Sequence, residues 1–340
     1  ARAVAIAFVV REAKSGRIAG RITADPVALA AEAEATVDVR IPIADCRLWS
    51  PEDPFLYRLE ADSGADRFTT RFGMREFKFD PVTRHARLNG QPYFLRGTNF
   101  TLYRFFFFFY CKLLPWTDDW VRLLHQRVKE MRWNSIRYCI GFPPEAWYEI
   151  ADELGLLIQD EFPLWRLSDV NHGQLETEYG EWMRERWNHP SVVIWDAQNE
   201  TITPETGTAI SAVRGLDLSG RPWDNGWSPP QAPGDSLEQH IYHFSPWRSF
   251  DRFTLSDLAR TERVPRSNEH KANDGRHAVI INEYAWLWLN RDVSPTTLTS
   301  GFYHHALGEQ ASPAQRRHLD ATHFAAETEF WRSYREVAAL

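Results

Sequence analysis

The hydrophobic pattern changes character near residue 80. Before that point the chain holds short apolar stretches, several alternating with polar positions and separated by Pro, Asp, Gly and Ser. Such alternation is typical of strands with one buried face. The pattern therefore predicts a small antiparallel β-sandwich over residues 1–80. Its strands are expected at residues 4–10, 19–23, 36–43, 55–61 and 67–79.

From about residue 90 the pattern becomes a strand followed by a helix, repeated several times. Strands are expected at residues 94–99, 134–139, 156–160, 192–196, 222–227, 239–244 and 279–283. Helices are expected at residues 120–132, 143–154, 175–187, 204–214 and 313–337. This alternation is typical of an α/β domain with a parallel sheet. We expect residues 81–340 to form a (β/α)8 TIM barrel.

The pattern accounts for seven barrel strands, and the chain ends where an eighth would begin. A barrel lacking one strand would expose two long edges. We therefore expect a barrel truncated before strand eight and a sandwich that lacks its first strands. The alternative is that the sandwich or a partner chain covers the opening.

Two of the expected strands end in a glutamate. Residues 192–196 lead into Asn199 and Glu200, and residues 279–283 end in Glu283. Active-site residues of such barrels lie at the carboxyl ends of the strands, where these two strands would face each other across the opening. Paired carboxylates about 5–5.5 Å apart serve retaining glycosidases, and pairs about 6.5–9.5 Å apart serve inverting ones. The alternative is that each glutamate makes a structural ion pair.

Composition narrows the function classes. The net charge of −7 lacks the basic excess expected for a nucleic-acid or anionic-membrane partner. The 15 Trp, 11 Tyr and 21 Phe suit either a large aromatic core or a carbohydrate site. Three distant cysteines form neither a disulfide framework nor a zinc motif, and no metal is expected. No signal peptide or membrane-spanning stretch is recognisable, and the compartment and oligomeric state stay open.

One segment fits no periodic pattern. Residues 105–109 are five consecutive phenylalanines that follow the first expected barrel strand. Structural burial, an aromatic wall facing the substrate and an error in the sequence are all open.

Several short motifs occur together in the order of one known family. They lie at residues 48–54, 71–77, 88–92, 96–99, 134–137, 147–155, 187–200 and 280–284. Over roughly residues 40–290 the chain thus resembles glycoside hydrolase family 2, which includes β-galactosidases, β-glucuronidases and β-mannosidases. The resemblance implies that the sandwich is immunoglobulin-like. It also implies a retaining exo-β-glycosidase, β-galactosidase-like, that acts on β-linked carbohydrate without a cofactor.

The resemblance also implies roles for individual residues. Glu200 would be the general acid/base and Glu283 the nucleophile. We expect Glu283 to be ionised and burial to raise the pKa of Glu200. The expected substrate-binding residues are Arg137, Asn199, Tyr242, His240, Asp160 and Trp286.

Several of these residues have competing structural interpretations. Arg137 could pair with Asp160 or Glu161 while it orients the nucleophile. Asn199 would hydrogen-bond the sugar or cap a loop, and Trp286 would form a sugar platform or core. Tyr242 would hydrogen-bond the nucleophile. For His240, a structural role and a place in the sugar site are equally open.

The chain departs from the family in one place that bears on specificity. Residues 138–143 read Tyr-Cys-Ile-Gly-Phe-Pro where many members have Ser-His-Tyr-Pro. The missing histidine helps to bind the sugar, so neither galactose nor glucuronate specificity follows. The competing interpretation is a non-catalytic carbohydrate-binding protein, or an inactive fragment, with the same fold.

Overall fold

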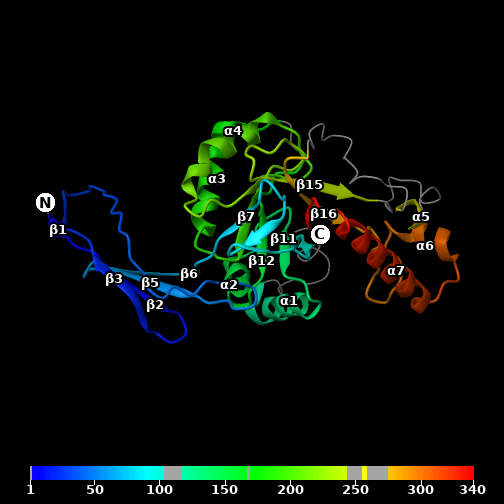
Figure 1. Cartoon of the computed structure of the whole chain (residues 1–340), viewed down its shortest axis with the longest axis horizontal. Coiled ribbons are helices and arrows are strands. Elements are labelled where there is room, and N and C mark those ends of the chain that lie inside the picture. The colour runs from blue at the N-terminus through cyan, green and yellow to red at the C-terminus, as the bar shows by residue number, and fades with distance from the viewer. Residues whose placement is uncertain (1, 103–115, 167–168, 243–254, 259–274) are drawn as a thin grey trace.

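An elongated N-terminal β-region extends from a larger body of strands and helices in the computed structural model (Figure 1). The residues that the structure describes are 2–102, 116–166, 169–242, 255–258 and 275–340. The phenylalanine run at residues 105–109 lies outside them, as do Cys111 and His243. Within the described part, no helix is both long and apolar enough to cross a membrane.

The N-terminal region is built on one antiparallel sheet with the strand order β3-β2-β5-β6. These strands are β2 (Ala7–Glu12), β3 (Ile18–Thr23), β5 (Tyr57–Asp62) and β6 (Arg67–Phe72). A separate antiparallel pair joins β1 (Arg2–Val4) to β4 (Val27–Leu29). In the described residues this is one four-stranded sheet and one pair, so the immunoglobulin-like sandwich stays a prediction.

The strand expected at residues 36–43 is wrong. This segment contains Pro42, which has no N–H to donate to a neighbouring strand. It instead packs beside β3 without a ladder. A Cβ atom on Gly20 would come within 2.8 Å of Ile41 and of the Pro42 carbonyl, so the close approach requires glycine there.

The strand expected at residues 67–79 is broken in two, and the break attaches the sheet to the α/β body. After β6 the chain packs Gly73 against Pro190, where a Cβ atom would lie only 2.7 Å from the proline ring. Arg75 donates hydrogen bonds to the carbonyls of Pro190 and Val192. A three-stranded antiparallel sheet follows, made of β7 (Phe77–Phe79), β8 (Ala86–Leu88) and β9 (Gln91–Pro92).

Eight strands of the α/β body run parallel to their sheet neighbours. The first sheet holds β10 (Gly97–Phe100), β11 (Ser135–Tyr138), β12 (Leu157–Glu161), β13 (Val192–Asp196) and β14 (Trp223–Asp224). The second sheet holds β15 (Ser236–Ile241), β16 (Ala278–Tyr284) and β17 (Val337–Ala339). Parallel ladders connect the neighbours within each sheet.

The prediction that the chain stops before an eighth strand is wrong. The last helix ends at Arg332, and β17 then pairs with β16. Leu95, just before β10, pairs with Ala339, and the Gly97 amide donates to the Leu340 carbonyl at 2.9 Å. The last strand therefore lies beside the first. It escaped the sequence pattern because it is three residues long and contains two alanines, which favour helix.

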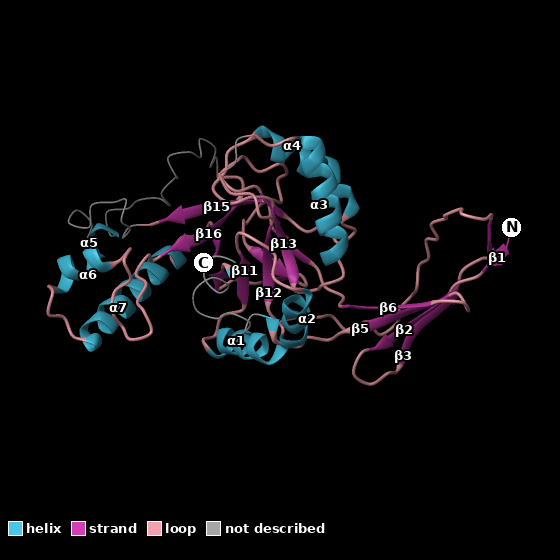
Figure 2. Ribbon diagram, turned by 180° about the vertical axis from the view of Figure 1, so that it is seen from behind, coloured by secondary structure: helices cyan, strands magenta, loops and turns pink. Residues whose placement is uncertain are grey.

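The helices of the described residues are α1 (Asp118–Glu130), α2 (Glu145–Leu154), α3 (His172–Arg186), α4 (Pro204–Val213), α5 (Leu255–Leu258), α6 (Ser300–Leu307) and α7 (Pro313–Arg332), with a short 3-10 helix, η3 (Arg214–Leu216). Helices α1 to α4 lie around the first sheet, whereas α5, α6 and α7 form a group to one side, beyond β15 and β16 (Figure 2). The α/β alternation expected from the sequence is confirmed for α1 to α4, which each follow a strand.

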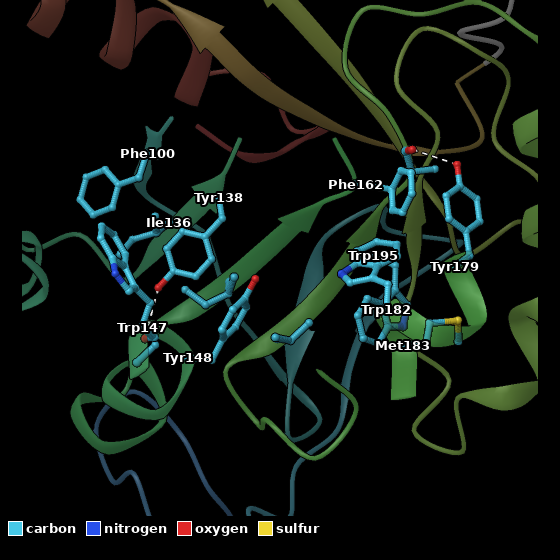
Figure 3. Close-up of a cluster of buried hydrophobic side chains, with 14 of the residues drawn as sticks. Phe100, Ile136, Tyr138, Trp147, Tyr148, Phe162, Tyr179, Trp182, Met183 and Trp195 are labelled. Carbon is cyan, nitrogen blue, oxygen red and sulfur yellow. Dashed lines mark hydrogen bonds between the residues drawn. The ribbon is translucent and has the colours of Figure 1, made fainter. Parts of the chain in front are cut away.

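A layer of aromatic side chains fills the space between the first sheet and its helices (Figure 3). Trp147 and Tyr148 from α2 and Trp182 from α3 pack against the outward-facing residues of the strands. The Trp182 and Trp195 rings meet edge to face at 4.9 Å, which is a favourable geometry for aromatic pairs. Much of the aromatic excess is therefore core, and this core fixes the strand ends that carry polar residues.

The buried His189 lies just before β13, and its protonation is expected to make the stability of the fold depend on pH. His189 Nδ1 lies 2.7 Å from Asp152 and Nε2 lies 2.8 Å from Glu145. Burial alone lowers the pKa of His189, but these carboxylates raise it to about 9. Stability from this group is thus fully present below the unfolded pKa of about 6.5 and is lost as pH rises through 9.

We expect His189→Gln to remove about 3 kcal/mol of the pH-dependent free energy of unfolding between pH 6 and pH 10. Urea denaturation of both proteins across this range measures the difference. His172→Gln is the matched control, since His172 pairs with Glu205 at the surface. If the free energy of unfolding of His189→Gln depended on pH as that of the wild type does, the charged state of buried His189 would be contradicted.

Candidate active site

Arg137 lies at the centre of a polar cluster on the inner side of the strands. Its guanidinium is only 4% exposed. Its Nε donates to Asp196 Oδ2 at 2.9 Å, its Nη1 to Glu283 Oε1 at 2.9 Å and its Nη2 to Asn199 Oδ1 at 3.2 Å. It also pairs with Glu161, one of the two acids considered for it. Arg137 therefore joins the ends of β11, β13 and β16.

Glu200 and Glu283 face each other across His240. His240 Nδ1 lies 3.2 Å from Glu200 Oε1 and 3.7 Å from Glu283 Oε2. An oxygen of each carboxylate and a ring nitrogen of His240 all lie within 4.8 Å of one another. The structure thus brings together the two glutamates that the sequence pattern singled out. Their nearest oxygens are thus closer together than the carboxyl groups of an inverting pair, which lie about 6.5–9.5 Å apart.

Strained turns follow the strands that carry this cluster. Four non-glycine residues after β11, β12, β13 and β16 adopt a left-handed backbone conformation. They are Ile140, Arg166, Glu200 and Ala285, with φ values of 53°, 52°, 44° and 54°. Such conformations cost roughly 1–3 kcal/mol each and cluster at functional sites. Glu200 itself is one of them, so its backbone is held in place by the surrounding packing.

The expectation of a raised pKa for Glu200 is wrong for this state. Trp165 Nε1 donates to Glu200 Oε2 at 3.1 Å, and the Arg166 guanidinium reaches the same oxygen at 2.8 Å. Burial alone raises the pKa of Glu200, but hydrogen bonds from His240 and Trp165 and the charges of His240 and Arg166 lower it to about 2. Glu200 is therefore held ionised.

Trp165 and Arg166 were not among the residues expected in the site. They lie four and five residues beyond the end of β12, at the same edge of the sheet as Glu200. Trp165 also forms an isolated bridge with Asn199, which fixes their proximity. The rule that barrel sites form from loops after strands could have pointed to them.

His240 carries a positive charge between carboxylates. Burial alone lowers the pKa of His240, but the charges of Glu283 and Glu238 and the hydrogen bond with Glu200 raise it well above its usual range. In the group of Glu200, His240 and Glu283, His240 Nδ1 is hydrogen-bonded to Glu200, and it lies 3.7 Å from Glu283, close enough for charge attraction. Both roles considered for His240 meet here, since it is buried and lies beside the glutamates.

A second group of acids lies deeper between the strands. Oxygens of Asp196, Asp224 and Glu238 lie within 4.8 Å of one another, a spacing that would admit a cation. Burial raises the pKa of Asp196 to about 7 and that of Asp224 well above its usual range. The raised pKa values of these two groups reduce the negative charge beside Glu238, which pairs with Arg137. None of the three was expected in the site, because the sequence does not show that strand residues meet in the interior.

Two of the remaining expected residues, Tyr242 and Trp286, pack against each other near His240. The Tyr242 ring lies 4.8 Å from Trp286 and 6.3 Å from His240, beside the glutamate pair. Its hydrogen bond to Glu283 stays a prediction, as does a sugar platform at Trp286, which stacks on Trp288 at 4.3 Å.

Asp160 is not brought into the cluster. It points toward the helices, where it accepts hydrogen bonds from Tyr148 and Trp182. Its neighbour Glu161 faces inward instead, because successive strand residues point to opposite faces.

Comparisons with known proteins agree on one family. Glycosyl hydrolases family 2 matches residues 9–75. A putative β-glucuronidase of Formosa agariphila is 29% identical over 210 residues, which are 54% of this chain and 19% of that protein. A β-galactosidase of Lactococcus lactis is 31% identical over 190 residues, which are 48% of this chain and 17% of that protein. The chain thus spans less than a fifth of these relatives.

Solved structures of other proteins have a similar fold. A β-glucuronidase from Ruminococcus gnavus, in complex with D-glucuronic acid, superposes with a TM-score of 0.66 at 18% identity. The match covers 98% of this chain and 55% of that one, and shows a shared α/β fold. Together with the sequence matches, this places the chain among proteins similar to glycosyl hydrolases family 2, whose model matches residues 9–75.

Proposed function

We propose that this chain carries the catalytic barrel of a retaining exo-β-glycosidase. The eight parallel strands and their helices form the (β/α)8 barrel over residues 81–340, and residues 1–80 belong to an immunoglobulin-like domain. Support comes from β17 lying beside the start of β10 and from the polar cluster on the inner side of the strands. The relatives named above act, by their names, on β-glucuronides and β-galactosides.

The proposed reaction has two displacements. Because Glu200 is ionised without substrate, it must first take up a proton in the enzyme–substrate complex. Glu283 then attacks the anomeric carbon while the glycosidic C–O bond breaks and Glu200 gives this proton to the leaving oxygen. Glu200 then takes a proton from water, the water oxygen attacks the anomeric carbon, and the bond to Glu283 breaks. Arg137 holds Glu283 in position throughout through its hydrogen bond to Oε1. Asn199, fixed by the same guanidinium, is aligned to bond a sugar hydroxyl.

One observation supports this proposal most strongly. Glu200 and Glu283 are 83 residues apart in the sequence, yet both lie near the same His240 nitrogen and have oxygens within 4.8 Å of each other. Structural ion pairs alone would not require the two acids to converge. The short separation supports retention, because an inverting pair needs room for a water between its carboxyl groups.

The test is a panel of aryl β-glycosides (galactoside, glucuronide, mannoside, glucoside and arabinoside) assayed on the intact protein. The proposal predicts turnover of at least one, with a ranking that gives the sugar; a β-galactosidase-like enzyme would rank the galactoside first. Isothermal titration with the same sugars tests the competing function. Binding without turnover by the intact protein would favour a carbohydrate-binding protein. Turnover to a product of inverted configuration would instead contradict the retaining mechanism.

A further inference from the structure

Arg166 is an exposed cation that contacts the mostly buried carboxylate of Glu200. Its side chain is 63% exposed, whereas Glu200, which it contacts, is 11% exposed. Its Nη2 and Nε lie 2.8 and 3.1 Å from Glu200 Oε2. The backbone amide of Arg166 donates to Thr201 Oγ1 at 2.7 Å, which fixes the start of the side chain. The position is therefore anchored while the guanidinium remains open to solvent.

The two oxygens of Glu200 have different surroundings. Oε1 faces His240, which leads to Glu283 and the interior. Oε2 faces Trp165 and Arg166, on the side that is open to solvent. In the proposed reaction, Glu283 attacks from one side of the sugar and Glu200 protonates the oxygen that departs on the other. Arg166 thus lies on the leaving-group side of the scissile bond.

We propose that Arg166 is a specificity-determining residue that recognises an oxyanion, a carboxylate or a sulfate, on the leaving-group side of the scissile bond. This inference rests on the proposed glycosidase function. Guanidinium offers five N–H donors in a planar fork, and two are directed at one Glu200 oxygen. An oxyanion on the leaving group competes with Glu200 for the N–H donors of Arg166. When the oxyanion binds them, Glu200 loses a cation that holds it ionised, and Glu200 can then carry the proton for the leaving oxygen.

Removal of the cation has a second consequence that a structural role would not have. The charged groups facing Glu200 are Arg166 from the turn after β12, His240 from β15 and Glu283 from β16. Arg166 lowers the pKa of Glu200, so its loss raises that pKa. The general acid then keeps its proton to higher pH. The basic limb of the pH–rate profile is expected to move upward in Arg166→Gln.

The experiment uses aryl β-glycosides of the best sugar from the panel. Three nitrophenol leaving groups of matched acidity are compared: one uncharged, one carboxylated and one sulfated. We expect the wild type to prefer an anionic leaving group by about tenfold or more in kcat/KM, the gain of a charge-assisted hydrogen bond. Arg166→Gln should lose this preference, and Arg166→Lys should keep part of it, since lysine keeps the charge without the fork.

Arg127→Gln is the matched control, because Arg127 is also 63% exposed and paired with a glutamate, on α1 away from the site. Preference for only one anion identifies which oxyanion the site takes. An equal anionic-to-neutral ratio in wild type and Arg166→Gln, with turnover intact, overturns this inference alone. Turnover of none of the glycosides by the wild type overturns the proposed function and this inference with it.

Discussion

Glu283→Gln is expected to lower kcat on aryl β-glycosides by about 10⁴- to 10⁶-fold, the loss typical of removing a nucleophile. The amide has the same shape as the carboxylate, and its oxygen still accepts from Arg137 Nη1. Folding and sugar binding should therefore survive while the covalent step does not. Steady-state kinetics measure the loss, and isothermal titration checks that the sugar still binds.

The control for this variant is Glu130→Gln, which alters an exposed acid at the end of α1. It should have wild-type kinetics. If Glu283→Gln retained more than a few per cent of wild-type turnover, with contaminating enzyme excluded, Glu283 would not be the nucleophile. The proposed pair would then be wrong even if the protein proved to be a glycosidase.

Arg137→Met is expected to damage both stability and catalysis. The substitution leaves Glu161, Asp196 and Glu238 buried without the cation that pairs with them. Breaking a buried charge pair in this way costs roughly 3–5 kcal/mol. We also expect kcat/KM to fall by about 100-fold or more, because Glu283 loses the hydrogen bond that orients it.

Arg221→Met separates the two effects. Arg221 is equally buried and pairs with Asp217, but it contacts the backbone at the start of β13 rather than the glutamate pair. Urea denaturation should show a comparable loss of stability for both variants, while only Arg137→Met loses activity below its unfolding range. Full activity in folded Arg137→Met would argue against its role in positioning Glu283.

The sequence pattern predicted the elements that surround the glutamates because their signals are local. Residues 192–196 coincide with β13, since a fully buried β-branched run needs little tertiary context. The strand β17 was missed for the opposite reason. Its alanines favour helix, and only pairing with β16 and with Leu95 makes it a strand.

The site was predictable in its residues more than in its electrostatics. Glu200 and Glu283 stand at strand ends, where position alone singles them out. Trp165 and Arg166 contact Glu200 because Arg166 has a left-handed backbone conformation, which no local sequence pattern predicts. The lowered pKa of Glu200 depends on them and on His240, so the direction of this shift could not be predicted from the sequence. Asp160 was expected in the site, but its neighbour Glu161 is the residue that faces inward, because alternation fixes a face only when the strand register is known.

The most direct test of the central claim is to trap the covalent intermediate. A 2-deoxy-2-fluoro-β-glycosyl fluoride of the preferred sugar destabilises the transition states of both displacements, while fluoride leaves without needing an acid. The intact mass should then rise by one fluoroglycosyl group, and peptide mapping should place that group on the peptide containing Glu283. An active protein that formed no adduct, or carried it on another residue, would contradict the account.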